Sequence, residues 1–133
     1  MKKLDNFQKS VKNLKEVYKY EPPYDVVDLT GLVGLFQLCF ELSWKTMKEY
    51  LTEEGFPAGA TGSPRTIIKS AYQAGIIMDQ DIWLSMLADR NDTSHEYDID
   101  VAETIIDRVR ESYYPELEKL LEKFVNRPSE IKK

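Results

Sequence analysis

The residues with the clearest chemical potential lie in the stretch DRNDTSHEYD, residues 89–98, between two apolar, helix-periodic segments. Arg90 precedes His95, the only histidine of the chain, by five residues, and Tyr97 follows two residues later. An arginine can clamp phosphate oxygens through two parallel hydrogen bonds, and a histidine titrates near neutral pH. In RNA the substrate supplies the nucleophile: a base removes the 2′-hydroxyl proton, and an arginine stabilises charge on the phosphorane. These residue types therefore suit a metal-free phosphoryl transfer.

The expected place of this stretch in the chain also suits an anion. Arg90 is expected near the C-terminus of one helix, and His95 and Tyr97 in or beside the first turn of the next. Unpaired backbone donors and the positive end of the helix dipole at such a turn favour a phosphate. One histidine per chain is few for separate acid and base roles, and two copies across a dimer axis would supply both.

A purely structural role accounts for the same three residues. Arg90 could cap the last carbonyls of its helix, His95 could be a polar loop residue, and Tyr97 could pack under the bundle. Because an arginine and a histidine five residues apart arise often by chance, the spacing alone favours this structural interpretation.

Two further charged pairs are candidates for the same site. Glu41 and Lys45 lie four residues apart in FELSWK and predict a solvated ion pair on one helix face, with the alternative that Glu41 reaches a dimer cleft. Arg65 and Lys69, one turn apart, could form the local basic patch that an acidic protein needs for RNA or for a partner. Ordinary surface charge is the simpler explanation for this second pair.

Composition and charge exclude several other classes of function. The chain of 133 residues has a formal net charge of -5, and nonspecific binding to nucleic acid depends on Lys and Arg, so any RNA chemistry must rest on a local patch. One cysteine and one histidine, distant in sequence, cannot make a structural zinc site, and no loop has the alternating Asp spacing of a calcium site. Cys39 lies in the apolar run GLFQLCFELSW and is expected to be a buried, inert thiol. We expect no metal and no cofactor.

The lengths of the apolar segments predict the cellular location. No stretch approaches the roughly 18 apolar residues of a membrane span. The start MKKLDNFQKS lacks the apolar core of a signal peptide. We therefore expect a cytoplasmic protein without a membrane partner.

The apolar periodicity predicts an all-α protein, an antiparallel bundle of about five helices. Residues 4–20 carry one apolar stripe on a lysine-rich helix that stops at EPPYD. A long second helix is predicted from about Asp25 to Leu51. Its apolar surface is wider than one stripe, which indicates burial on two sides, either by the rest of the fold or by a second copy of the chain. Gly31 and Gly34 are costly inside a helix and predict the close approach of another helix.

Caps and breakers divide the second half of the chain. The glycine-rich TEEGFPAGATG lacks the ending of a phosphate-binding loop and is interpreted as a plain loop. Ser63 is expected to cap a short third helix that begins at Pro64 and closes at Gly75.

Two more helices complete the predicted bundle. The fourth begins at Asp79 or Asp81, and the last begins at Asp98 or Asp100 and continues through Pro115. An interior proline predicts a kink or a split of the last helix near residues 111–115. Residues 1–126 are expected to form a single helical domain, followed by a frayed tail over residues 127–133.

Several blocks of the sequence resemble one protein superfamily. RNDTSH matches the R-N-x-x-x-H motif of the HEPN superfamily, and RNDTSHEY matches the extended R-x4-H-x-Y form of HEPN toxins paired with small MNT nucleotidyltransferases. FELSWKTMKEYL, GSPRTIIKSAYQAGII and IWLSMLADRNDTSHEYD are similar to the nucleotidyltransferase substrate-binding protein family within that superfamily. The resemblance covers roughly residues 5–125.

The resemblance implies a HEPN-like five-helix bundle that forms a homodimer, so that two R-x4-H motifs meet in one cleft, and an MNT-type nucleotidyltransferase that binds it. By position, Arg90 and His95 would be the catalytic pair of a metal-independent endoribonuclease, with Asn91 as a polar support. Tyr97 would be the hydroxyl to which the partner transfers AMP, which silences the toxin of a toxin-antitoxin pair. The alternative is a non-catalytic subunit that binds nucleotide for the nucleotidyltransferase. Sequence does not separate the two, because binding a phosphate and cleaving beside it use the same residues.

Overall fold

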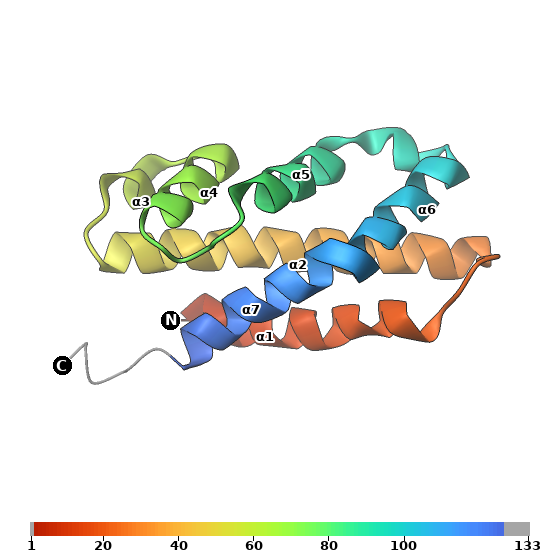
Figure 1. Cartoon of the computed structure of the whole chain (residues 1–133), viewed down its shortest axis with the longest axis horizontal. Helices are drawn as coiled ribbons and strands as arrows, with labels where there is room; N and C mark the ends of the chain where they lie inside the picture. The colour runs from red at the N-terminus through yellow and green to blue at the C-terminus, as the bar shows by residue number, and fades with distance from the viewer. Residues whose placement is uncertain (1, 127–133) are drawn as a thin grey trace.

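The computed structural model describes residues 2–126 as a bundle of helices (Figure 1), and no β-strand occurs within that range. The predicted all-α class is therefore confirmed, while the expected frayed tail, residues 127–133, lies outside the described residues. In chain order the elements are α1 (Lys2–Leu14), the 3-10 turn η1 (Lys15–Lys19), α2 (Val26–Glu53), α3 (Pro57–Thr61), α4 (Pro64–Gln73), α5 (Gln80–Asn91), the 3-10 turn η2 (Thr93–Glu96), α6 (Ile99–Arg108), the π-helical turn η3 (Val109–Tyr113) and α7 (Tyr114–Val125).

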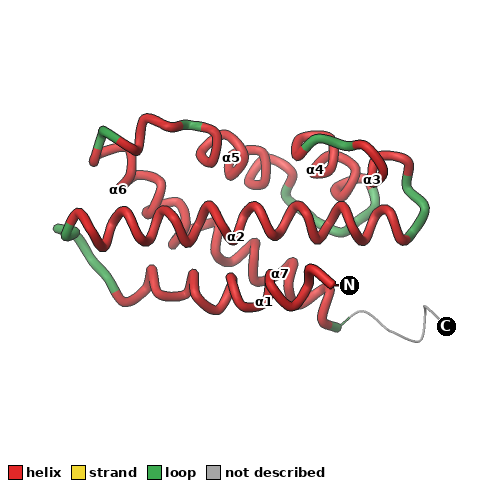
Figure 2. The backbone as a smooth tube through the Cα atoms, turned by 180° about the vertical axis from the view of Figure 1, so that it is seen from behind, coloured by secondary structure: helices red, strands yellow, loops and turns green. Residues whose placement is uncertain are grey.

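The other helices pack around α2, which is the central element of the bundle. In Figure 2 it crosses the front of the molecule, with α1 along one side, α3, α4 and α5 along the other, and α7 behind. Asp25, the predicted start of this helix, caps it by accepting backbone N–H groups of the first turn. The core side chains of α2 are Leu29, Leu32, Val33, Phe36, Cys39, Phe40, Trp44, Met47 and Leu51.

The packing of α2 settles two expectations. By length and composition α2 could cross a bilayer, so the expectation that no segment comes close to a membrane span is wrong. One face of α2 lies in the core of the bundle, which accounts for the apolar residues on that face. The predicted burial of Cys39 is confirmed, and this burial raises the pKa of its thiol to about 12. The thiol therefore stays protonated and unreactive near neutral pH.

The opposite face of α2 is open over the N-terminal half of the helix. Val27 and Leu38 are 73% and 51% exposed, and no other element among residues 2–126 comes within 4 Å of a Cβ placed on Gly31 or Gly34. The close approach predicted at these glycines therefore does not occur within the described chain. We call this face, formed by Val27, Gly31, Gly34 and Leu38, the apolar seam of α2.

The connection after α2 contains a short helix, α3, where a plain loop was expected. Its glycines allow it to pack tightly against the end of α2. A Cβ on Gly59 would lie 2.5 Å from the backbone nitrogen of Thr52, and the Thr52 hydroxyl donates a hydrogen bond to the Gly59 carbonyl at 2.8 Å. Gly59 and Gly62 are explained by this close packing, whereas Gly55 has open space around it and a positive φ of 84°.

The predicted cap residues position the helices that flank the motif. Ser63 caps α4 through its side chain, and Gly75 closes it with a positive φ of 78°, as predicted. Asp79 caps α5. Asp98, rather than Asp100, caps α6, because its carboxylate accepts two backbone N–H groups of the first turn. The polar stretch of residues 89–98 therefore joins two helices whose first turns are both capped.

The predicted irregularity before Pro115 takes the form of a π turn. The Tyr114 N–H donates to the Val109 carbonyl, five residues earlier. In this register the donor to the Arg110 carbonyl would be Pro115, which has no N–H. The Tyr18 hydroxyl donates to that carbonyl instead, at 2.8 Å. The proline is thus accommodated without an unpaired backbone acceptor.

Candidate functional site

Two polar side chains on α2 hold the arginine and the histidine of the motif. Gln37 Nε2 lies 3.0 Å from His95 Nε2, and the Glu41 carboxylate forms an ion pair with the Arg90 guanidinium. Gln37 and Glu41 are four residues apart and so share one face of the helix. Arg90 comes from the last turn of α5 and His95 from η2. The structure therefore brings the motif residues from two elements onto one face of α2.

Glu41 is shared between two cations. Its second oxygen lies 3.3 Å from Lys45 Nζ, so it forms the predicted ion pair and also reaches the motif. Partial burial raises the pKa of the Glu41 carboxyl, but hydrogen bonds, above all from Arg90, outweigh this effect and hold the pKa below its usual value. Glu41 is therefore ionised near neutral pH and keeps Arg90 in place.

Three contacts fix the Arg90 guanidinium. In addition to Glu41, its Nη1 donates to Asn91 Oδ1 at 3.0 Å, and its carbon lies 6.0 Å from the centre of the Phe40 ring. Glu41 and Asn91 use two of the five N–H donors of a guanidinium. Other donors can meet a phosphate while the side chain stays anchored.

The Gln37 side chain occupies one nitrogen of His95. Its amide nitrogen lies 3.0 Å from His95 Nε2 and acts as the donor in this contact. A substrate hydroxyl that donates to Nε2 must therefore displace the Gln37 amide.

Tyr97 projects from the same turn into solvent. The side chain is 83% exposed and directly precedes Asp98, the cap of α6. Packing under the bundle, one of the two sequence-based interpretations, is therefore wrong for this residue. The hydroxyl is accessible to a second protein.

Asp89 is the centre of a second polar cluster, which the sequence reasoning missed. Its carboxylate accepts from Arg108 Nη1 at 2.8 and 3.0 Å and from the Tyr113 hydroxyl at 2.5 Å. Burial and the bond to Asp89 raise the pKa of Tyr113, whose ring stacks on Phe36. Asp89 and Arg90 are adjacent in the last turn of α5. Asp89 attaches this turn to α6 and η3, and Arg90 attaches it to α2.

Gln37 and Asp89 differ in how far the sequence could have revealed them. Gln37 interrupts an otherwise apolar run one turn before Glu41, a signal that marks both as facing the same side. Asp89 pairs with residues 19 and 24 positions later, and no local pattern indicates such a contact.

The predicted basic patch on α4 lies apart from these contacts. Arg65 and Lys69 are exposed, and among residues 2–126 no hydrogen bond or ion pair links them to the motif. Within the same range, no three His, Cys, Asp or Glu side chains are grouped so that they could hold a metal ion. The contacts of the site are thus made by polar and aromatic side chains of α2, α5 and η2.

Comparison with known proteins identifies relatives over the whole described range. The model of a family described as "Nucleotidyltransferase substrate binding protein like" matches residues 2–126. The curated protein "Probable ribonuclease HepT" of Haemophilus influenzae is 32% identical over 72 residues, which are 53% of this chain and 49% of the relative. The match therefore spans about half the length of that relative.

Two solved structures share the fold. A protein of Thermus thermophilus superposes with a TM-score of 0.79 at 30% identity, covering 91% of this chain and 99% of its own. HI0074 of Haemophilus influenzae, whose structure reveals the fold of a substrate binding domain of a nucleotidyltransferase, gives a TM-score of 0.78 at 23% identity, covering 90% and 97%. The helical arrangement around α2 is common to all three chains.

The shared Glu41 carboxylate generates a prediction about acid stability. Glu41→Gln should lower the free energy of unfolding by about 1 kcal/mol near neutral pH, because it removes a partly buried ion pair with Arg90. The pKa of Glu41 is lower in the folded protein, so this stabilisation is present above the unfolded value of about 4.3 and is lost as pH falls through the folded value. Denaturant titrations at a series of pH values measure the effect.

Glu53→Gln, an exposed substitution at the end of the same helix, is the matched control. It should leave the free energy of unfolding nearly unchanged throughout. A gap between Glu41→Gln and the wild type that persists undiminished to about pH 3 would contradict the assignment.

Proposed function

We propose a function from the premise that this chain belongs to the nucleotidyltransferase substrate binding protein like family. In this proposal the protein is a metal-independent endoribonuclease with Arg90 and His95 as its catalytic pair. It is also the HEPN partner of an MNT-type nucleotidyltransferase in a toxin-antitoxin system. The observation that carries the proposal is the joint positioning of these two residues on one face of α2 by Glu41 and Gln37. The similarity to "Probable ribonuclease HepT" supports it.

The chemistry uses groups of the chain and of the RNA. Arg90 binds the nonbridging oxygens of the scissile phosphate and stabilises the charge that develops on the phosphorane. His95 Nε2 takes the 2′-hydroxyl proton after the substrate displaces the Gln37 amide. The 2′-oxygen bonds to phosphorus, and the bond to the 5′-oxygen breaks. That oxygen leaves with a proton, and a 2′,3′-cyclic phosphate remains.

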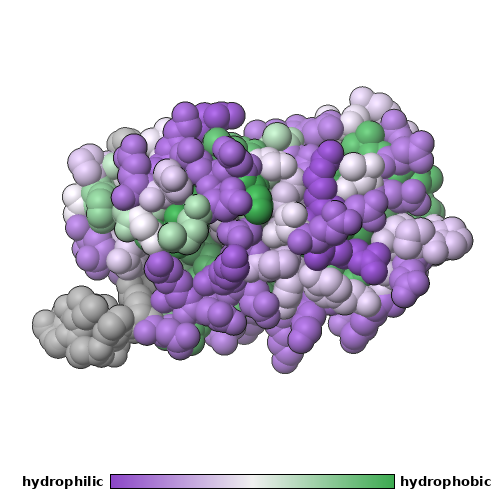
Figure 3. Space-filling view, in the orientation of Figure 1, coloured by the Kyte–Doolittle hydropathy of each residue, from purple (hydrophilic) through white to green (hydrophobic). Residues whose placement is uncertain are grey.

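A homodimer through the apolar seam of α2 supplies the second histidine for protonation of the leaving oxygen. The seam is exposed, and its two glycines leave room for a partner helix. It is continuous with Gln37 and Glu41, so two copies packed on it bring their motifs near each other. The side of the molecule seen in Figure 3 is mainly hydrophilic, with hydrophobic residues in smaller patches.

Cleavage of RNA in the presence of a chelator is the primary test. The purified protein should cut single-stranded RNA and leave 2′,3′-cyclic phosphate ends. His95→Ala and Arg90→Lys should each reduce the rate by about 100-fold or more, the first by removing the base and the second by removing the bidentate clamp. Arg65→Lys, on exposed α4, serves as the control and should cut at the wild-type rate. Intact RNA after incubation with folded wild-type protein would overturn the proposal.

Charge on the seam should dissociate the dimer. We expect Leu38→Glu to sediment as a monomer at micromolar concentration, whereas the wild type sediments at about twice the 15.5 kDa chain mass. Val125→Glu is the control, because Val125 is 50% exposed and Leu38 is 51% exposed, and only Leu38 is on the seam. Dissociation by neither or by both variants would speak against this interface.

A second candidate function is a non-catalytic subunit that binds nucleotide for the nucleotidyltransferase. It is favoured by the fold shared with HI0074, whose structure is that of a nucleotidyltransferase substrate binding domain.

The exposed Tyr97 hydroxyl provides the observation that discriminates between the ribonuclease and the binding subunit. If the partner transfers AMP to it, an oxygen–phosphorus bond to Tyr97 forms and pyrophosphate leaves. We expect the added phosphate to bind Arg90 in place of the RNA phosphate, so that cleavage stops.

Intact-mass spectrometry after incubation with the cognate nucleotidyltransferase and ATP tests this step. We expect the wild type to gain whole AMP units on Tyr97 and to lose its ribonuclease activity. Tyr97→Phe should remain folded and unmodified. Tyr72→Phe, which removes another exposed tyrosine, should be modified like the wild type. AMP on another residue, or none with a partner of proven activity, would leave Tyr97 without this role.

A further inference from the structure

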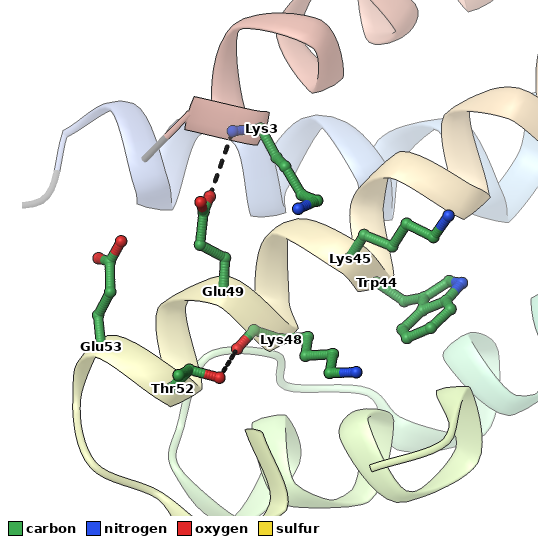
Figure 4. Close-up of a pocket in the computed structure, with 7 residues that line it drawn as sticks. All are labelled: Lys3, Trp44, Lys45, Lys48, Glu49, Thr52 and Glu53. Carbon is green, nitrogen blue, oxygen red and sulfur yellow. Dashed lines mark hydrogen bonds between the residues drawn. The ribbon is translucent and has the colours of Figure 1, made fainter. Parts of the chain in front are cut away.

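The face of α2 that carries Glu41 continues toward the helix C-terminus as a basic surface. Lys45 and Lys48 follow at successive turns, and Lys3 approaches from the start of α1 (Figure 4). With Trp44 and Thr52 they line a hollow of about 440 Å³. Lys45 is also the residue that pairs with Glu41, so the hollow adjoins the motif directly.

The charges of the hollow are arranged unevenly. Glu49 and Glu53 also line it, but in Figure 4 their carboxylates lie toward one end, and the amines of Lys45 and Lys48 lie beside Trp44 toward the other. Glu49 accepts a hydrogen bond from the Lys3 backbone N–H at 3.2 Å. Among residues 2–126, neither the Lys3 nor the Lys48 ammonium has a carboxylate within ion-pair distance. The end beside Trp44 therefore holds positive charge that is free to meet an anion.

We propose that Lys3, Lys45 and Lys48 form a phosphate subsite for single-stranded RNA, which binds a phosphodiester flanking the one held by Arg90. This inference rests on the proposed function. Glu41 and Lys48 are seven residues apart, about 10 Å along the helix axis, so a strand held at Arg90 can place a neighbouring phosphate there. The lysines contact the backbone of the strand and carry no base preference.

Two features of the chain direct the strand to this end of α2. On the other side of the motif lies the apolar seam, which offers no charge to a polyanion and is covered in the proposed dimer. The net charge of -5 requires that RNA be bound by a local basic surface. In the described part of the chain no hydrogen bond or ion pair links Arg65 or Lys69 on α4 to the motif, whereas Lys45 is joined to it through Glu41.

The test measures binding of a short single-stranded RNA to the His95→Ala protein, which leaves the RNA uncut. Fluorescence anisotropy is recorded over a range of salt concentrations. Adding Lys48→Ala should weaken binding about fivefold at low salt and reduce the magnitude of the slope of log affinity against log salt by about 0.7, the value for one phosphate contact on a single strand. Lys48→Arg should restore both quantities. Lys12→Ala, an exposed lysine in a different groove of α1, should change neither.

A nucleoside triphosphate presents the same phosphate chemistry, so ATP is titrated in parallel. If RNA binds equally well with and without Lys48, the subsite is wrong while the proposed nuclease stands. If ATP binds, RNA does not, and Lys48→Ala weakens ATP, then the hollow is a nucleotide site and the RNA inference is overturned. If the parent protein binds neither ligand, both the subsite and the proposed function fail.

Discussion

The ion pair between Arg90 and Glu41 is the contact on which the arrangement of the site depends. Only about a quarter of the Arg90 side chain is exposed, and a guanidinium cannot release its proton in a protein, so this position requires a carboxylate partner. Glu41 supplies it from the central helix. The contact therefore joins the end of α5 to α2 and fixes where η2, and with it His95, can lie.

α2 presents three different surfaces along its length. One face fills the core, the open N-terminal half presents an apolar seam, and the open C-terminal half presents lysines. Gln37 and Glu41 stand at the junction of these surfaces. A partner copy on one side of the junction and an RNA strand on the other can therefore both approach the motif without competing for the same surface.

Local rules predicted most of the fold. The all-α class, the cap at Ser63 and the irregularity before Pro115 follow from periodicity, side-chain capping and the missing proline N–H. The caps of α5 and α6 were each left open between two aspartates, Asp79 or Asp81 and Asp98 or Asp100, because both residues of a pair lie close to the helix start and only the backbone geometry decides which accepts. α3 was missed because a five-residue helix produces no periodic signal.

The site was predicted less completely than the fold, because its contacts join residues that lie far apart along the chain. The arginine and histidine were visible as a motif, and Glu41 as half of an ion pair. Arg90 pairs with Glu41 from 49 residues away, and His95 contacts Gln37 from 58 residues away. Such contacts appear only when the helices are placed in space. The same holds for Asp89, whose neighbour Arg90 was noticed while Asp89 itself was not.

The most direct measurement of the central claim, a cleft shared by two copies, is the cleavage rate of dimers mixed from wild-type and His95→Ala chains. If both histidines of a dimer are required, an equal mixture after subunit exchange should retain about a quarter of the wild-type rate, because only dimers with two intact chains are active. A rate that falls in proportion to the wild-type fraction, to about half in the equal mixture, would mean that each chain cleaves alone and would contradict the shared cleft.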